Sequence, residues 1–251
     1  MKILTIHSFA VHGTASLKAI ISLLGTRVLP VPSLFLSGLT NIPGIIKTET
    51  QLPEILESTF AISRAREEKL IVYIGYLGNA GQVKLIRRLI EKNRDIIVSI
   101  VVDPVSGDHG KMYVPPTVVE AWPGLLEIAD WALPNYTELT LLSGAGEKAT
   151  EEEHLNAFRD KFSSLSYIIT SMPHSGQLKL LLHHNGIAQP FTHKKENINF
   201  SGTGDIFAAH FIMSYFFRRQ SPFQAMRMAA EATHAVIRRS MELGSEDIVL
   251  E

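Results

Sequence analysis

The chain has 251 residues, no cysteine and a formal net charge of −1, from 24 basic and 25 acidic side chains. The lack of thiols excludes disulfides, thiolate nucleophiles and cysteine-ligated zinc, and the balanced charge provides no broad field for binding nucleic acid or an anionic membrane. The sequence has neither a secretory signal pattern nor an apolar run near the ~20 residues that a membrane-spanning helix needs. We therefore expect a cytoplasmic protein with a single domain over residues 1–251.

Apolar runs typical of buried strands alternate with segments of helical periodicity along the chain. The predicted strands are residues 2–7, 28–36, 70–76, 96–103, 131–135 and 167–171. The predicted helices are residues 14–24, 52–67, 81–92, 116–128, 205–218 and 222–242. This alternation predicts an α/β fold in which helices cover both faces of a mostly parallel central sheet, a layered α/β/α architecture.

An antiparallel hairpin is predicted late in the chain. Residues 178–184 and 187–192 are strand-like and flank the pair Asn185-Gly186, which is a strong signal for a two-residue hairpin turn. Since no repeat or linker interrupts the pattern, we expect this hairpin to form an edge of the same sheet.

The stretch Ser201-Gly202-Thr203-Gly204-Asp205 stands directly before an apolar helical run. Glycines at the start of a helix let backbone N–H groups approach an anion closely, and Asp205 could then accept a proton from an alcohol that attacks a phosphate. The alternative is an ordinary helix start, in which the acid only complements the helix dipole.

Two other acidic residues follow predicted strands. Asp103 ends an Ile/Val-rich strand, where a carboxylate points into the ligand crevice of a parallel sheet, although Asp103-Pro104 is also a common turn. Glu138 stands three residues after Asn135, which suits either a helix capping box or a carboxylate that helps to hold hydrated Mg²⁺.

The histidines show no metal-ligand spacing. His7, His12 and His210 are scattered along the chain, and a core or solvated role is the simplest interpretation for each.

Seven short stretches, in this order, resemble motifs of the ribokinase-like superfamily, and within it the bacterial pyridoxal/pyridoxine kinase family. They are Gly13-Thr14-Ala15-Ser16-Leu17, Leu36-Ser37-Gly38-Leu39-Thr40, Gly75-Tyr76-Leu77-Gly78, Asp103-Pro104-Val105-Ser106-Gly107-Asp108, Met112-Tyr113-Val114-Pro115, Pro134-Asn135-Tyr136-Thr137-Glu138 and Gly202-Thr203-Gly204-Asp205. The resemblance extends over nearly the whole chain and implies that ATP phosphorylates the 5′-hydroxymethyl group of pyridoxal, pyridoxine or pyridoxamine.

The resemblance also implies a role for each matching residue. Asp205 is the general base, and the backbone of Gly202, Thr203 and Gly204 stabilises charge on the transferring phosphoryl group. Ser8, Thr40 and Tyr76 match contacts to the substrate ring. Asp103 and Glu138 match positions near the phosphates and Mg²⁺, and Ser171 matches a nucleotide contact.

Relatives of this kind are usually homodimers and often respond to K⁺. Leu133 replaces a threonine that many relatives have near the nucleotide or cation site, which leaves K⁺ dependence open. A hydroxymethylpyrimidine kinase, whose substrate is also a flat heteroaromatic alcohol, is the alternative enzyme. A catalytically silent protein that only binds the vitamin is the alternative from another class.

Overall fold

The computed structural model describes residues 1–146 and 148–250, and Glu147 and Glu251 lie outside the described residues. Within that part of the chain, a nine-stranded sheet has the order β11-β10-β9-β8-β5-β4-β1-β2-β3. Its strands are β1 (Lys2–Ala10), β2 (Val28–Leu36), β3 (Lys47–Glu49), β4 (Leu70–Ile74), β5 (Ile97–Val102), β8 (Trp131–Ala132), β9 (Ser166–His174), β10 (Gln177–His184) and β11 (Ile187–Lys194). A separate pair comprises β6 (Gly107–Asp108) and β7 (Lys111–Met112).

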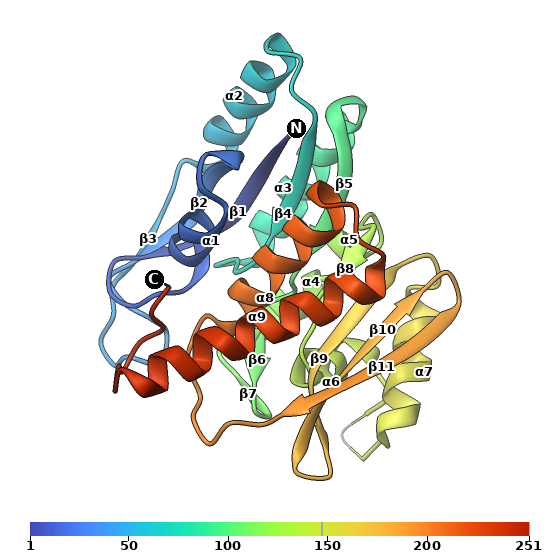
Figure 1. Cartoon of the computed structure of the whole chain (residues 1–251). Helices are drawn as coiled ribbons and strands as arrows, with labels where there is room; N and C mark the ends of the chain where they lie inside the picture. The colour runs from blue at the N-terminus through green and yellow to red at the C-terminus, as the bar shows by residue number, and fades with distance from the viewer. Residues whose placement is uncertain (147, 251) are drawn as a thin grey trace.

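Helices cover both faces of the sheet, as the alternating pattern predicts (Figure 1). They are α1 (Ser16–Leu24), α2 (Leu52–Ala65), α3 (Ala80–Lys92), α4 (Pro116–Ala121), α5 (Pro123–Leu126), α6 (Tyr136–Ser143), α7 (Glu151–Lys161), α8 (Thr203–Ile212) and α9 (Pro222–Glu242). Apolar side chains of α1, α8 and α9 pack on one face, and those of α2 to α7 pack on the other. Two apolar layers therefore enclose the sheet.

The central strands are parallel. β1 pairs in this way with both β2 and β4, and the parallel pairing continues through β5 and β8 to β9. Their side chains alternate between the layers: Leu4 and Ile6 pack with α2 to α7, whereas Ile3 packs with α1, α8 and α9. The carboxyl ends of these strands consequently meet at one edge of the sheet.

The predicted hairpin is confirmed. β10 and β11 are antiparallel, with Asn185 and Gly186 at the turn at φ values of 51° and 76°. Positive φ at both central residues is the requirement of a type I′ turn, which Asn-Gly meets at little steric cost.

Several elements differ from the prediction. The helix expected over residues 116–128 is broken into α4 and α5, and Pro123, at the start of α5, has no N–H to continue the first helix. The helix expected from Asp205 starts at Thr203 and continues beyond Ile212 as a π-helix, Met213–Phe217. The strand expected over residues 131–135 has only two residues, and β3, β6, β7 and α7 were not predicted.

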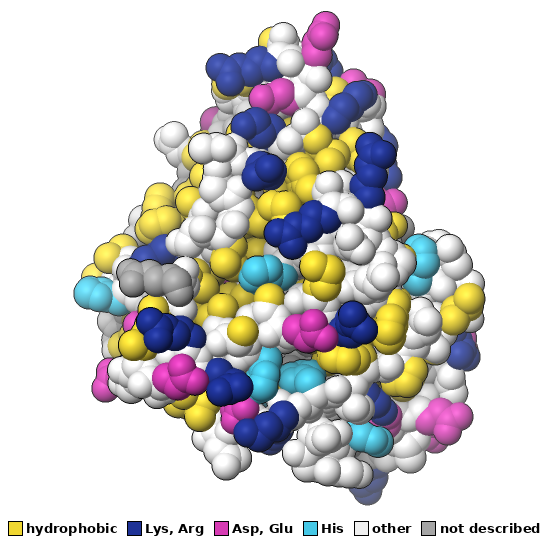
Figure 2. Space-filling view, in the orientation of Figure 1, with side chains coloured by type: hydrophobic (Ala, Val, Ile, Leu, Met, Phe, Trp, Pro, Cys, Tyr) yellow, Lys and Arg dark blue, Asp and Glu magenta, His cyan; other side chains and the backbone are white. Residues whose placement is uncertain are grey.

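The surface is mixed in charge. On the face in Figure 2, basic and acidic side chains are interspersed, with apolar side chains between them. Over residues 1–146 and 148–250, no helix combines the length and apolar character needed to cross a membrane.

Candidate active site

A cavity of about 340 Å³ opens at the carboxyl ends of the parallel strands. Most of the residues predicted for the site line it: Ser8, Thr40, Tyr76, Asp103, Glu138, Gly204 and Asp205. They come from different elements of the sheet and from the start of α8. This edge is where open parallel sheets bind their ligands.

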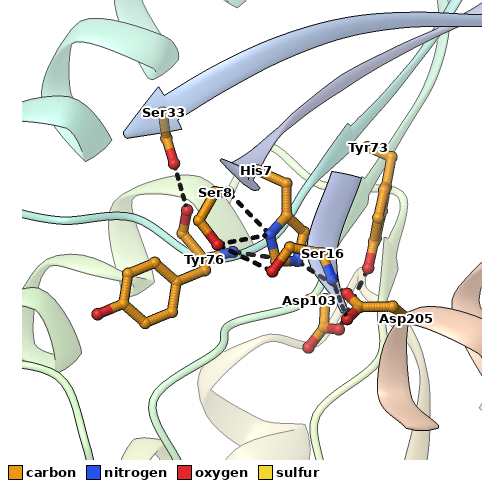
Figure 3. A network of polar contacts seen from close by, with 8 residues as sticks. All are labelled: His7, Ser8, Ser16, Ser33, Tyr73, Tyr76, Asp103 and Asp205. Atoms are coloured by element: carbon orange, nitrogen blue, oxygen red, sulfur yellow. Dashed lines mark hydrogen bonds and ion pairs between the residues drawn. The ribbon is translucent and has the colours of Figure 1, made fainter. Parts of the chain in front are cut away.

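Asp205 is the third residue of α8, and its side chain is held from two sides (Figure 3). Its Oδ1 lies 3.0 Å from Nε2 of His7, and its Oδ2 accepts the backbone N–H of Ser16 at 2.6 Å. Asp205 is only 7% exposed, yet it lines the cavity. A carboxylate oxygen has two lone pairs, so each oxygen retains one for a ligand.

Gly202 forms the turn that precedes α8. Its φ is 90°, and a Cβ atom there would lie 2.5 Å from the carbonyl oxygen of Thr14. Both the left-handed backbone and the close approach to another segment therefore require glycine. The first N–H groups of α8 have no partner within the helix and, with the helix dipole, form a site suited to a phosphate group.

Asp103 follows β5 and lies close to this helix start. A Cβ atom on Gly204 would be 3.9 Å from Oδ2 of Asp103, and the hydroxyl of Tyr73 donates a hydrogen bond to that oxygen at 3.3 Å. Burial, reinforced by the negative charge of Asp205, raises the pKa of Asp103 to about 7. Burial and the charge of Asp103 also raise the pKa of Tyr73, so its hydroxyl stays protonated and donates.

Glu138 forms the capping box considered for it from sequence and also lines the cavity. Its Oε2 accepts the backbone N–H of Asn135 and the side chain of Asn135 accepts the N–H of Glu138, which is a capping box at the start of α6. Its Oε1 accepts the N–H of Ser106, and Glu138 lines the cavity. Burial and the charge of Asp103 raise the pKa of Glu138 well above the ordinary value of glutamate.

The acidic pair suits a magnesium ion held mainly through water. Across residues 1–146 and 148–250, no cluster of three or more histidine, aspartate or glutamate side chains could hold a metal. Mg²⁺ commonly keeps several waters and takes one or two carboxylates together with substrate phosphates. Asp103 and Glu138, two buried carboxylates with raised pKa values, fit that requirement because a cation would offset their mutual repulsion.

A second cavity of about 170 Å³ adjoins the first and contains Ser171 and Thr203. The two cavities share several lining residues: Asp108, His109, Thr170, Asn199, Phe200 and Gly204. Ser171 has a φ of 59°, and Ser16, in the first cavity, has a φ of 57°. Such strained backbone in non-glycine residues concentrates at binding sites, where the surrounding structure maintains it.

The remaining predicted contacts, Ser8, Thr40 and Tyr76, also line the first cavity. Tyr76 is 4% exposed, and its hydroxyl lies 3.5 Å from Nζ of Lys47. The hydroxyl of Ser8 is hydrogen-bonded to that of Ser16 at 2.8 Å, and Thr40 lines the same cavity. An aromatic wall with hydroxyl groups suits a flat polar ring.

Three residues that contact Asp205 or Asp103 were not predicted as part of the site: His7, Ser16 and Tyr73. His7 is buried, as a core histidine would be, but it contacts Asp205. The only sequence signal for His7 was its position beside Ser8 late in the first strand. Ser16 acts through its backbone, and Tyr73 lies within a strand that reads as uniformly apolar, so residue type alone identifies neither.

Comparisons with known proteins find relatives over most of the chain. A model of the phosphomethylpyrimidine kinase family matches residues 46–250. Pyridoxal kinase from Arabidopsis thaliana is 27% identical over 262 residues, covering 96% of this chain and 82% of that protein. Pyridoxal kinase from Dictyostelium discoideum is 32% identical over 186 residues, covering 68% of this chain and 60% of that protein. The match to a Schizosaccharomyces pombe relative covers 48% of that relative's length.

Solved structures give the same fold. Pyridoxal kinase from Leishmania donovani in complex with ADP and pyridoxamine has a TM-score of 0.81 and 26% identity, covering 99% of this chain and 90% of that chain. A Bacteroides thetaiotaomicron protein, provisionally assigned as a phosphomethylpyrimidine kinase and crystallised with pyridoxal, has a TM-score of 0.79 and 27% identity, covering 94% and 86%. The predicted layered fold is confirmed, and since the family model matches most of the residues, the chain belongs to the phosphomethylpyrimidine kinase family.

Proposed function

We propose that this protein transfers the terminal phosphoryl group of ATP to the 5′-hydroxymethyl group of a vitamin B6 vitamer: pyridoxal, pyridoxine or pyridoxamine. The observation that carries the proposal is the placement of Asp205. This carboxylate lines a cavity at the N-terminus of α8, where a base and a phosphate-binding helix start lie side by side.

Asp205 accepts the proton of the substrate hydroxyl as that oxygen attacks phosphorus. The N–H groups around Gly202, Thr203 and Gly204 stabilise charge on the transferring group. Phosphoryl transfer passes through a loose transition state, so positioning and electrostatic stabilisation supply most of the catalysis. A site without a covalent nucleophile is therefore sufficient.

Asp103 and Glu138 would hold Mg²⁺, in part through water, and the ion would supply charge neutralisation at the phosphates. The second cavity takes the nucleotide, with Ser171 and Thr203 at its wall. Leu133 lines the first cavity and its side chain has no oxygen, so we propose no side-chain ligand for K⁺ at that residue.

Tyr76, Thr40 and Ser8 bind the substrate ring. Support comes from the aromatic and hydroxyl lining of the first cavity and from family relatives named as pyridoxal kinases. The Leishmania donovani structures, with ADP and pyridoxamine or with ADP and pyridoxine, add support for these ligand classes.

The test is ADP formation with ATP and Mg²⁺ over a panel of pyridoxal, pyridoxine, pyridoxamine and hydroxymethylpyrimidine, with each phosphorylated product identified by mass. Asp205→Asn should lower kcat by on the order of 10²-fold or more, because a neutral amide cannot accept the proton. Asp160→Asn, at an exposed position of α7, is the matched control and should keep full turnover. Full turnover by Asp205→Asn would exclude Asp205 as the base.

Hydroxymethylpyrimidine phosphorylation is the second candidate, favoured by the name of the matching family. Both substrates are flat heteroaromatic alcohols, so the ratio of kcat/KM values measured in competition separates them. If vitamers raise the melting temperature but no ADP forms with any alcohol, the protein is a binding protein and the kinase proposal fails. A homodimeric state, measurable by light scattering, and a cytoplasmic location stay predictions.

A further inference from the structure

His7 lies beside the proposed catalytic base but outside the roles assigned so far. It comes from β1, is 2% exposed, and its Nε2 is 3.0 Å from Oδ1 of Asp205 (Figure 3). The other oxygen of Asp205 accepts the backbone N–H of Ser16. The imidazole and this N–H therefore hold the carboxylate from two sides.

The contacts of the ring select one tautomer. Nδ1 of His7 accepts the backbone N–H of Ser8 at 2.9 Å, so Nδ1 carries no proton. The proton of a neutral imidazole is then on Nε2, the ring nitrogen that lies 3.0 Å from Oδ1 of Asp205. The N–H of Tyr76 also points at Nε2, from 3.4 Å, so an N–H group and a carboxylate oxygen both face this nitrogen. A proton on Nε2 suits the shorter of the two contacts, the one to Asp205, and leaves Nδ1 to accept the N–H of Ser8.

The ring has little room to leave this position. A Cβ atom on Gly75 would lie 1.9 Å from Cδ2 and 2.1 Å from Nε2 of His7. The imidazole thus packs directly on the backbone of Gly75, next to the strand that leads to Tyr76. Close packing of this kind restricts a side chain to one rotamer.

We propose that His7 is a positioning residue for the phosphoryl transfer described above: a neutral Nε2–H donor that fixes the orientation of Asp205 toward the substrate hydroxyl. This inference rests on the proposed function. Because Nδ1 is already occupied by an N–H group, His7 does not receive the proton that Asp205 takes up. Its effect is geometric, and misplacement of a catalytic group by about 1 Å can cost about 100-fold in rate.

The test compares two substitutions of similar length. His7→Gln keeps a neutral N–H donor, and His7→Met keeps most of the volume but has no donor. We expect His7→Met to lower kcat by about 10- to 100-fold, with KM for ATP and for the vitamer within about 2-fold, and His7→Gln to stay within about 3-fold of the wild type. His154→Gln is the control, since His154 is equally buried and hydrogen-bonded to Ser143 but is absent from the cavity lining.

A second readout does not depend on turnover. In the intact protein labelled with ¹⁵N-histidine, the ring signals lost in His7→Gln identify His7, and their shifts should report a protonated Nε2 and an unprotonated Nδ1. A proton on Nδ1 would overturn the proposal, even if His7→Met fails to fold.

The kinetic outcomes separate this inference from the proposed function. If the wild type turns over and His7→Met has an unchanged kcat, the role of His7 is overturned and the kinase proposal stays intact. The same holds if His7→Met and His7→Gln lose kcat equally. If the wild type phosphorylates none of the four alcohols, the proposed function fails and the catalytic role of His7 fails with it.

Discussion

Asp103→Asn should raise the free energy of unfolding of the metal-free protein at pH 8. The same substitution should reduce the stability that the protein gains from added Mg²⁺. Asp103 is buried near Asp205, and its ionised form is disfavoured by both burial and that neighbouring charge. An asparagine removes the charge but keeps an oxygen that accepts the hydrogen bond from Tyr73.

The magnitude follows from the pKa of Asp103, which is about 7 in the folded protein against an ordinary value of 3.8 for an aspartate side chain. Because the folded-state pKa is raised, the stabilising contribution of protonated Asp103 is complete below about pH 4 and is lost as the pH rises through 7. The interval from pH 5 to the folded-state pKa of about 7 is about two pH units. Each unit corresponds to 1.36 kcal/mol in free energy of unfolding. Relative to the variant, the wild type should therefore lose about 1 to 3 kcal/mol in free energy of unfolding between pH 5 and pH 8.

The measurement is urea unfolding in EDTA at pH 5 and pH 8 for the wild type, Asp103→Asn and the exposed control Asp160→Asn. Added Mg²⁺ should raise the unfolding free energy of the wild type more than that of Asp103→Asn, since the ion offsets the buried charge. A pH dependence of stability that is identical in the wild type and Asp103→Asn would refute this account of the acidic pair.

Three further substitutions test other parts of the site. Gly202→Ala should destabilise the protein by about 2 kcal/mol or more in urea unfolding, because its φ is 90° and the new Cβ would meet the carbonyl oxygen of Thr14; an unchanged midpoint would contradict this. Tyr76→Ala should raise KM for the vitamer by about 10-fold with KM for ATP unchanged, as the aromatic wall is lost; a change confined to ATP would place Tyr76 in the wrong subsite. Gly75→Ala should displace the ring of His7 and lower kcat at least 10-fold, and normal kcat would show that the ring can move without consequence.

The fold was predictable where periodicity is strong. β1, β2 and β4 are apolar runs in a parallel sheet, and α3 and α9 have clear apolar faces. The missed elements lack such a signal. In α7 most side chains are charged, with only His154 and Phe158 buried, and β6 and β7 have two residues each, too few to show any period.

The carboxylates and glycines of the candidate site could be named from the sequence. The groups that hold these carboxylates in place could not. Asp205, Asp103 and Glu138 stand in short motifs at the ends of strands or at the start of a helix, and the structure brings all three to one cavity. The donors that hold Asp205 are a backbone N–H and a buried histidine, from segments about 190 residues earlier, so they depend on tertiary packing rather than on local sequence.

This long-range clamp on Asp205 has a consequence for synthesis on the ribosome. The N–H of Ser16 and the carboxylate of Asp205 are separated by 189 positions, so a nascent chain that already contains every central strand still lacks the carboxylate proposed as the base. At about 5 to 20 residues per second, the 189 positions from Ser16 to Asp205 take some 10 to 40 seconds to translate. Until α8 and α9 emerge and dock, the face of the sheet that they cover together with α1 is only partly packed, and its exposed apolar side chains are a target for chaperones.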